Sequence, residues 1–313
     1  MADELRVFSG NAHLSLASAV CSYLGIPLGK AEVFQFSNEN IFVRILENIR
    51  GRDVFIIQPI CSPVNQNLME LLIMLDATKR ASAGRITAVV PYYGYGRTDK
   101  KDQPRVPITA RLVADLVTVA GANRVLTVDL HAGQIQGFFN IPVDELSALS
   151  LLASYFKKKN LFDLVVTSAD VGGVKRARDL SEKLGCPLAI IAKRRMGNAD
   201  KTETLTLIGE VKGKNVVVVD DEIDTASSFL GVLDILRPHD VQDIYACCTH
   251  PIFSGPAVSR ISQSGVKEVV VTDTVPIPQD KMLSQITVLS IASLLGEAIH
   301  RIHTGLSIGA MFE

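Results

Sequence analysis

One segment of the sequence combines an apolar run with acidic and hydroxyl side chains, which are groups that bind sugars and phosphates. Four consecutive valines at positions 216–219 predict a buried strand, and a helix is predicted to begin near Phe229. In an open α/β sheet, ligands bind beyond the carboxyl ends of the strands, where the polar residues of this segment are expected. These polar residues are Asp220, Asp221, Asp224, Thr225, Ser227 and Ser228.

The start of the predicted helix suits a phosphate, because a helix N-terminus presents free N–H groups and a positive dipole end. Adjacent carboxylates beside an anion site need hydroxyl donors or Mg²⁺ to offset their charge. A sugar phosphate meets both needs, with its phosphate on the loop and its ribose hydroxyls on Asp220 and Asp221. The alternative is a helix capped by Thr225 or Ser227 after an acidic turn, with no ligand.

The elements that position this segment alternate between short β-branched runs and helical patterns along nearly the whole chain. Helices are predicted from apolar residues at helical spacing, and strands buried on both faces of a parallel sheet from continuous apolar runs. The predicted helices are 67–81, 108–120 and 174–184. The predicted strands are 54–58, 86–91, 125–129, 164–168, 188–192, 215–220, 243–248 and 268–272. This pattern predicts an α/β fold with βαβ connections.

Both halves of the chain begin with the same succession of strand, glycine-containing turn, helix and strand. We therefore expect two similar α/β domains, each with a mainly parallel sheet flanked by helices, at residues 1–147 and 148–313. The sugar-phosphate segment falls in the second of them. The boundary is placed where a helical stretch leads to Lys157, Lys158 and Lys159.

Charge and composition exclude several classes of partner. The 313 residues carry 32 Lys and Arg against 33 Asp and Glu, a net charge of −1, which argues against nucleic acid or an anionic membrane as the main partner. No apolar run reaches the ~18 residues of a membrane span. The five cysteines are scattered and odd in number, which predicts reduced thiols. Together with an N-terminus that lacks signal or transit composition, this predicts a cytoplasmic protein.

Several further segments resemble signatures of one enzyme family. The sequence has Pro-Tyr-Tyr-Gly-Tyr-Gly-Arg at 91–97, Asp-Leu-His at 129–131 and Asp-Val-Gly-Gly-Val-Lys-Arg at 170–176. The acidic loop resembles the ribose-phosphate loop of type I phosphoribosyltransferases and of ribose-phosphate pyrophosphokinases, and the other segments select the second family. The resemblance runs from Val7 to Phe312. It implies two domains of the type I phosphoribosyltransferase kind.

The resemblance implies a transferase of nucleotide biosynthesis. The enzymes of this family move the diphosphoryl group of ATP to the 1-hydroxyl of ribose 5-phosphate, which yields 5-phosphoribosyl 1-diphosphate and AMP. Positioning and charge neutralisation carry most such catalysis, and Mg²⁺ is expected as the cofactor. A homo-oligomer, a hexamer built from dimers, is also implied. Two alternatives are a regulatory paralogue with weak or no activity and a phosphoribosyltransferase acting on a base.

The resemblance assigns roles to residues at matching positions. Ribose 5-phosphate would be bound by Asp220, Asp221, Asp224, Thr225, Ala226, Ser227 and Ser228. ATP would be bound by Phe36, Asn38, Asn40, Arg97, Thr98 and Asp102, with the Phe36 segment normally contributed by a neighbouring subunit. Lys193 and Arg195 would be catalytic, and His131 and Asp170 would bind metal. A regulatory site for phosphate or ADP would use Arg50, Ser82, Arg85, Arg105 and Ser307.

Some of these assignments have simpler alternatives that composition leaves open. His131 would then be a structural hydrogen-bonding residue, Asp170 part of an ordinary Asp-Gly turn, and Phe36 a core residue. Residues 193–195 would form a solvated basic turn.

The sequence also departs from the family pattern. Ser227 and Ser228 replace the usual Gly-Thr, Asn40 replaces a Glu, and Thr98 and Ala169 replace a Gln and a Pro. Glycine permits a positive φ and a close phosphate approach. If position 227 is left-handed, a side chain there costs ~1–2 kcal/mol.

Overall fold

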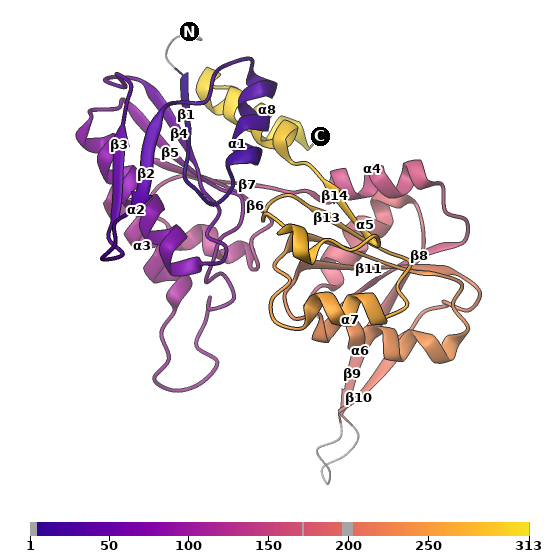
Figure 1. Ribbon diagram of the computed structural model, residues 1–313. Helices are drawn as coiled ribbons and strands as arrows, with labels where there is room; N and C mark the ends of the chain where they lie inside the picture. Colours follow the sequence, from indigo (N-terminus) through magenta and orange to yellow (C-terminus); the bar gives the residue numbers. More distant parts are fainter. Residues whose placement is uncertain (1–4, 171, 196–202, 313) are drawn as a thin grey trace. The chain divides into compact units, whose positions relative to one another are not determined.

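The computed structural model describes residues 5–170, 172–195 and 203–312, and for 192–195 and 203–205 it describes the backbone alone (Figure 1). Strands and helices alternate along most of this length, and they form two mainly parallel sheets with helices on their faces. The predicted α/β fold class is therefore confirmed. None of the described helices is long and apolar enough to cross a membrane.

The chain forms two compact units. Unit 1 consists of Met1–Ser147, Thr274–Pro276 and Ser290–Glu313, and unit 2 of Ala148–Asp273 and Ile277–Leu289. The expected division after residue 147 placed the whole remaining chain in one C-terminal domain, whereas the structure packs two late segments with unit 1. The cause is the last helix, which packs against the first helix of the chain.

Unit 1 is built on a five-stranded parallel sheet of order β1-β4-β5-β6-β7. Its central strands are almost wholly buried apolar runs, which is why they were predictable, whereas the peripheral strand β7 carries two acids. The strands are β1 (Leu5–Ser9), β4 (Asp53–Ile57), β5 (Arg85–Val90), β6 (Arg124–Val128) and β7 (Val143–Leu146).

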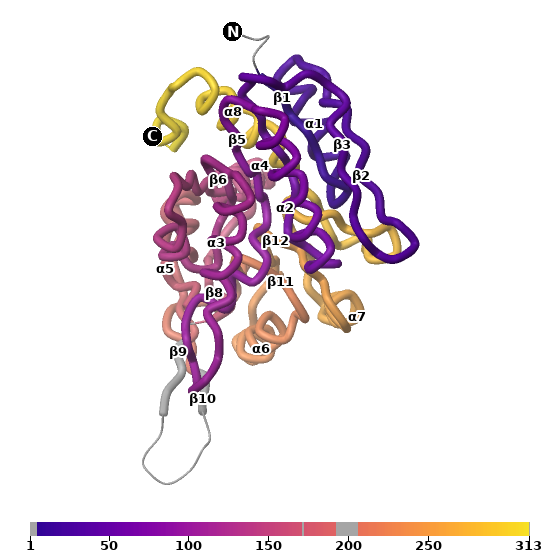
Figure 2. Tube along the Cα trace, turned by 90° about the vertical axis from the view of Figure 1, so that its left-hand side faces the viewer, coloured from indigo at the N-terminus to yellow at the C-terminus, as the bar shows by residue number. Residues whose placement is uncertain are grey.

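Helices and a hairpin surround this sheet. On one face, α2 (Val64–Arg80) and α3 (Thr109–Ala120) bury residues such as Met74 and Val113 against β4 and β5. A separate antiparallel hairpin, β2 (Ala31–Gln35) and β3 (Ile41–Ile45), packs on α2. Figure 2 shows this hairpin running alongside α2.

The first and last helices of unit 1 pack against each other (Figure 1). α1 spans Leu14–Leu24 and α8 spans Ala292–Thr304. A Cβ at Gly296 of α8 would lie 2.3 Å from the Tyr23 ring of α1, so the close approach requires glycine. His303 Nδ1 of α8 lies 2.7 Å from the Asp53 carboxylate in β4, and this contact holds the end of α8 against the sheet.

Unit 2 is built on a seven-stranded sheet of order β10-β9-β8-β11-β12-β13-β14. All neighbouring pairs are parallel except β9 and β10. The strands are β8 (Leu164–Ser168), β9 (Leu188–Arg195), β10 (Glu203–Ile208), β11 (Asn215–Ile223), β12 (Ile244–Pro251), β13 (Glu268–Thr272) and β14 (Ile286–Leu289). The strands predicted from continuous apolar runs in both units are confirmed, within one or two residues at most ends.

Two layers of helices cover this sheet (Figure 1). One core joins the sheet to α6 (Ser227–Leu236) and α7 (Ala257–Gln263). A second core joins its opposite face to α4 (Leu149–Lys159) and α5 (Val174–Leu184). Short 3-10 helices lie at Gly133–Phe138 and Gly309–Met311 in unit 1 and at Arg237–His239 and Gln279–Lys281 in unit 2.

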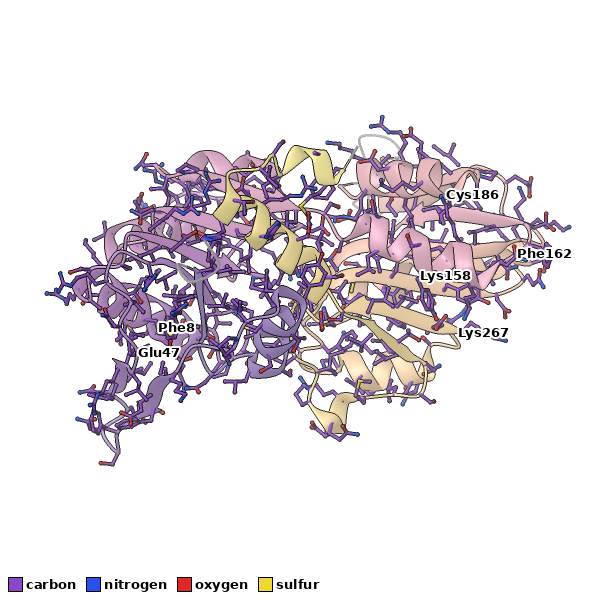
Figure 3. The ribbon with its side chains drawn as sticks, turned by 90° about the horizontal axis from the view of Figure 1, so that it is seen from above. Phe8, Glu47, Lys158, Phe162, Cys186 and Lys267 are labelled. Carbon is purple, nitrogen blue, oxygen red and sulfur yellow. The ribbon has the colours of Figure 1, made fainter. Side chains whose placement is uncertain are left out.

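A buried carboxylate links α4 to the sheet of unit 2. Glu268 accepts hydrogen bonds from Tyr155 and from Thr287, and it lies 2.8 Å from Lys159 Nζ. Burial alone would raise the pKa of Glu268, but the bonds from Lys159, Thr287 and Tyr155 lower it overall. Figure 3 labels Lys158 and Lys267, which precede Lys159 and Glu268 in the chain.

Candidate active site

The segment predicted to bind a sugar phosphate lies at the centre of the unit 2 sheet. β11 pairs with β8 on one side and with β12 on the other, and Asp220 and Asp221 lie in its second half. From β8 the chain continues to β9 on one side, and it returns to form β11 on the other side. The strand order therefore reverses between β8 and β11. Open α/β sheets bind ligands at such a switch point, beyond the carboxyl ends of the strands.

Burial and the neighbouring acidic groups at this switch point destabilise the charged form of Asp220. Burial raises the pKa of Asp220 to about 8, and the neighbouring carboxyls of Asp221 and Asp170 add to the rise. The Asp221 N–H donates to Asp220 Oδ1 at 2.9 Å, which opposes the rise in part. A charged Asp220 is thus costly without a partner, so the site suits a cation or hydroxyl donors such as those of a sugar.

The chain passes from β11 to α6 through a left-handed residue. Ala226 has φ 60° and ψ 16° and occupies the N-cap position, and no side chain caps the helix. The alternative that Thr225 or Ser227 serves only as a helix cap is therefore wrong, and α6 begins at Ser227 rather than near Phe229. Thr225 Oγ1 and Ser227 Oγ lie 3.0 Å apart. Two hydroxyls and the uncapped N–H groups of a helix start thus share one loop, which suits an anion.

Two side chains that follow β12 hold this loop, and neither was predicted from the sequence. Ser254 Oγ donates to the Asp224 carboxylate, and the Ser254 N–H donates to the Asp224 carbonyl at 3.0 Å. Arg260 Nη1 donates to the Thr225 carbonyl and to Ser227 Oγ, both at 2.8 Å. These partners are 30 to 35 residues apart in the chain, so no local motif reveals them.

Asp170 reaches the same switch point from the end of β8. The N–H of Ala169, the residue before Asp170, donates to the Val219 carbonyl at 3.2 Å, and the charge of Asp170 adds to the rise in the pKa of Asp220. Asp170 Oδ1 accepts a bond from the Gly173 N–H at 2.7 Å, so the Asp-Gly turn considered from the sequence is present. A Cβ at Gly172 would lie 3.3 Å from that oxygen, so glycine keeps the space beside the carboxylate open. Asp170 is thus both a turn residue and part of the acidic cluster.

In unit 1, the Phe36 segment forms the turn of the β2–β3 hairpin. The Phe36 N–H donates to the Asn40 carbonyl at 2.9 Å, and Asn38 Oδ1 accepts from the Asn40 N–H at 3.2 Å. The Phe36 side chain is 49% exposed, with its ring centroid 5.0 Å from that of Phe34 and 5.8 Å from that of Phe42. The alternative that Phe36 is a core residue of its own unit is therefore wrong.

The loop after β5 and the segment after β6 meet at the carboxyl edge of the unit 1 sheet. A Cβ at Gly96 would lie 3.6 Å from that of His131, which places the loop bearing Arg97 and Thr98 beside this exposed histidine. Asp99 accepts a bond from Gln134 Nε2 at 3.3 Å, which ties the same two segments together. The structure thus brings the residues expected to bind ATP phosphates next to His131.

The metal assignment divides between the two units, with His131 in unit 1 and Asp170 in unit 2. Within residues 5–170, 172–195 and 203–312, no group of three or more His, Cys, Asp or Glu side chains is arranged to hold a metal ion. A cation in unit 2 would therefore need ligands beyond the protein, such as water or phosphate oxygens.

Comparison with known proteins identifies the family. Residues 5–121 match the N-terminal domain of ribose phosphate pyrophosphokinase, and 195–313 match a phosphoribosyl synthetase-associated domain. A ribose-phosphate pyrophosphokinase of Caldanaerobacter subterraneus is 54% identical over 311 residues, covering 99% of this chain and 98% of the relative. One of Synechococcus elongatus is 52% identical over 312 residues, covering 99% and 94%. The chain belongs to the ribose-phosphate pyrophosphokinase family.

A solved structure supports this assignment at the level of the fold. The crystal structure of phosphoribosylpyrophosphate synthetase from Mycobacterium smegmatis superimposes with a TM-score of 0.91 at 44% identity, covering 96% of this chain and 99% of that one. The resemblance noted in the sequence to the pyrophosphokinase family is therefore confirmed over the whole chain.

The two residues that the family pattern marks as catalytic lie near the end of β9. In the pairing with β10, Lys193 is opposite Leu205 and Arg195 is opposite Glu203. Their side chains lie outside the described part of the structure, as does the whole of the segment 196–202 that follows. The backbone therefore places both residues on a strand pair, and their catalytic role stays a prediction.

The residues assigned to a regulatory anion site divide between the two edges of the unit 1 sheet. Near the N-terminal edge, Gly51 beside Arg50 donates to the Ser82 carbonyl at 2.8 Å, and Arg85 pairs with Asp53 and donates to the Ile302 carbonyl at 2.9 Å. Ser307 follows α8, whose end this contact holds. Arg105, by contrast, lies in the loop after the carboxyl end of β5.

Proposed function

We propose that this protein transfers the diphosphoryl group of ATP to the 1-hydroxyl of ribose 5-phosphate, giving 5-phosphoribosyl 1-diphosphate and AMP. The observation that carries the proposal is the pair Asp220–Asp221 at the switch point of unit 2, followed by a loop that presents hydroxyls and a helix N-terminus. Relatives that share about half of its residues are named for this chemistry.

Each part of the loop has a distinct task in binding ribose 5-phosphate. Thr225, Ser227 and Ser228 bind the phosphate together with the backbone of Ala226, because the Thr225 and Ser227 hydroxyls lie together at the uncapped start of α6. Asp220 and Asp221 accept hydrogen bonds from the ribose hydroxyls. Asp224, held by Ser254, fixes the turn between these two halves. The sugar is thus anchored at both ends, which limits the directions in which its 1-hydroxyl can attack.

Mg²⁺ fits the acidic groups of unit 2, because hard carboxylate oxygens bind hard cations and because the ionised form of Asp220 is unfavourable without a partner. We propose Asp170 as a ligand in unit 2 and His131 as a ligand in unit 1. When bound, Mg²⁺ neutralises phosphate charge, as in other phosphoryl transfers. The protein side chains orient the substrates, and Asp170 stays in place through its bond to the Gly173 N–H.

ATP is proposed to bind at the carboxyl edge of unit 1. Arg97 holds the phosphates or stacks on adenine, and Thr98 and Asp102 complete that loop. The active assembly is proposed to be a homo-oligomer, a hexamer built from dimers. In it, Phe36, Asn38 and Asn40 contact the adenine of the ATP that is bound to a neighbouring subunit. The exposed aromatic ring of Phe36 supports this proposal, because half of its surface lies open on the hairpin.

Lys193 and Arg195 are proposed to stabilise the transition state. Cations placed beside transferring phosphoryl groups offset the charge that develops there, and analogous arginine residues contribute about 10³–10⁵ in rate.

A regulatory anion site is proposed near the N-terminal edge of unit 1, at Arg50, Ser82, Arg85 and Ser307. A cytoplasmic location is proposed because all five cysteines are free thiols.

Incubation of the purified protein with ATP, Mg²⁺ and ribose 5-phosphate tests the proposed reaction. AMP should form in proportion to ribose 5-phosphate consumed, and ribose should not replace the phosphorylated sugar. Asp220→Asn and Asp221→Asn should each weaken ribose 5-phosphate binding. The absence of AMP from protein that is folded by circular dichroism would reject the proposal.

A further inference from the structure

Arg260 of α7 reaches the loop that binds ribose 5-phosphate in the proposed function. Its Nη1 atom donates to the Thr225 carbonyl and to Ser227 Oγ, both at 2.8 Å. Both of these acceptors are neutral, so the charge of the guanidinium is not cancelled by them. The side chain is half-buried, which strengthens its interactions relative to a fully solvated arginine.

The bond from Arg260 fixes which way the Ser227 hydroxyl points. A guanidinium can only donate, so Ser227 Oγ accepts from it and must direct its single proton elsewhere. In this structure Thr225 Oγ1 lies 3.0 Å away, within reach of that proton. An anion on the loop would offer a stronger acceptor for the same proton. The contact therefore makes Ser227 a donor toward the anion site.

Arg260 also bridges the strained residue of the loop. Its two acceptors belong to Thr225 and Ser227, which flank Ala226 with its φ of 60°. A left-handed alanine persists only where its surroundings hold it. The same segment of the chain holds Asp224 through Ser254. The segment after β12 thus contacts the loop on both sides of Ala226, at Asp224 and Thr225 before it and at Ser227 after it.

We propose that Arg260 is a positioning residue for the phosphate of ribose 5-phosphate. It orients the Ser227 hydroxyl as a donor, holds the left-handed turn at Ala226, and adds positive charge next to the anion. Ser227 stands where the family pattern has glycine, so this hydroxyl contact belongs to the serine that this chain carries. The inference rests on the proposed function, because that function supplies the anion on the loop.

Calorimetric titration of the full-length protein with ribose 5-phosphate, without ATP, tests the role of Arg260. Arg260→Gln should weaken binding by about 10-fold, the loss typical of a charge-assisted hydrogen bond, and Arg260→Lys should lose less. The affinity of the same variants for inorganic phosphate should fall in parallel. In turnover assays the KM for ribose 5-phosphate should rise while kcat stays within about 3-fold, because Arg260 acts on binding.

A double-mutant cycle separates this role from simple support of the fold. In the Ser227→Gly background, Arg260→Gln should cost no more than about 3-fold in affinity, because the hydroxyl is gone and only the charge of Arg260 and its bond to the Thr225 carbonyl remain to be lost. Equal losses in both backgrounds, or wild-type affinity in Arg260→Gln accompanied only by a lower melting temperature, would overturn the inference. If Arg260→Gln does not fold, Ser227→Ala removes the same contact, and unchanged affinity there would also overturn it.

The wild-type titration distinguishes this inference from the proposed function. Wild-type protein that binds ribose 5-phosphate, together with Arg260→Gln protein that binds it equally well, rejects the role of Arg260 and leaves the proposed function intact. Wild-type protein that does not bind ribose 5-phosphate rejects the proposed function and the inference with it.

Discussion

Ala226 is left-handed with φ 60°, and Ser227, the next residue, opens α6 in the right-handed helical region. This relationship changes the meaning of the serine that replaces the family's glycine. The conformational cost of a side chain at position 227 would arise only if that residue were left-handed, and the structure assigns that conformation to the preceding alanine. Ser227 therefore carries no such strain, and its hydroxyl is available to the loop.

The first prediction concerns this strain. Ala226→Gly should raise the free energy of unfolding by about 1 kcal/mol, because glycine adopts positive φ without the Cβ penalty. Ser227→Gly is the matched control, and it should lower the free energy of unfolding by about 0.5–1 kcal/mol, because glycine is unfavourable in a helix. Urea unfolding monitored by circular dichroism measures both. Stabilisation by Ser227→Gly but not by Ala226→Gly would show that the strain lies at position 227.

The second prediction is a pH dependence caused by Asp220. Burial raises its pKa from 3.8 to about 8 in the folded protein. Between these values the folded state holds a proton that the unfolded state has lost, so the free energy of unfolding should fall as pH rises from about 4 to about 8. Asp220→Asn should flatten this slope in urea unfolding series. An equally steep slope in the variant would assign the effect to other groups.

A third prediction concerns the basic residues of β9. Lys193→Ala should lower kcat by about 10²–10³ with little change in ribose 5-phosphate affinity, because the lysine is proposed to act on transition-state charge. Arg194→Ala removes a positive charge from the adjacent position, which has no proposed role, and it should retain most activity. Steady-state kinetics and calorimetric binding supply the two readouts. Equal losses of turnover and affinity in Lys193→Ala would contradict the assignment.

A fourth prediction concerns the ionic group that links α4 to the sheet. Lys159→Gln should lower the free energy of unfolding by about 1–2 kcal/mol, because it leaves the buried Glu268 carboxylate with one donor fewer. Lys158→Gln, at an exposed neighbouring lysine, should change it by less than about 0.5 kcal/mol. Because the pKa of Glu268 is lowered, this stabilisation should be present above its ordinary pKa of 4.5 and be lost as pH falls. Equal effects of the two substitutions would contradict this account.

The parts of the fold predictable from sequence are those that local hydrophobicity determines. The central strands are continuous apolar runs, so β8 and β13 were placed at their observed ends. The β2–β3 hairpin is half-exposed and β7 carries two acids, so neither stands out by its apolar pattern. The start of α6 was placed two residues late, because the helix has no side-chain cap to mark it.

In the site too, residues that follow a local sequence pattern were predictable, and residues brought together only by folding were not. Asp220 and Asp221 directly follow a run of four valines, and this change from apolar to acidic residues is visible in the sequence. Arg260 is 33 residues from Ser227 and follows the next strand, so only the folded sheet brings the two together. The left-handed turn at Ala226 was also hidden, because alanine gives no sign of positive φ. Sequence thus placed the acidic residues in the central strand of the sheet but did not indicate the residues that hold the following loop.

The most direct test of the proposed reaction follows the β-phosphorus of ATP. Purified protein is incubated with Mg²⁺, ribose 5-phosphate and ATP labelled with ³²P in the β-phosphate, and the products are separated by ion-exchange chromatography. Diphosphoryl transfer predicts that the label moves entirely into the sugar diphosphate and that AMP is unlabelled. Label recovered in ADP, or a sugar product without label, would contradict transfer at the β-phosphorus.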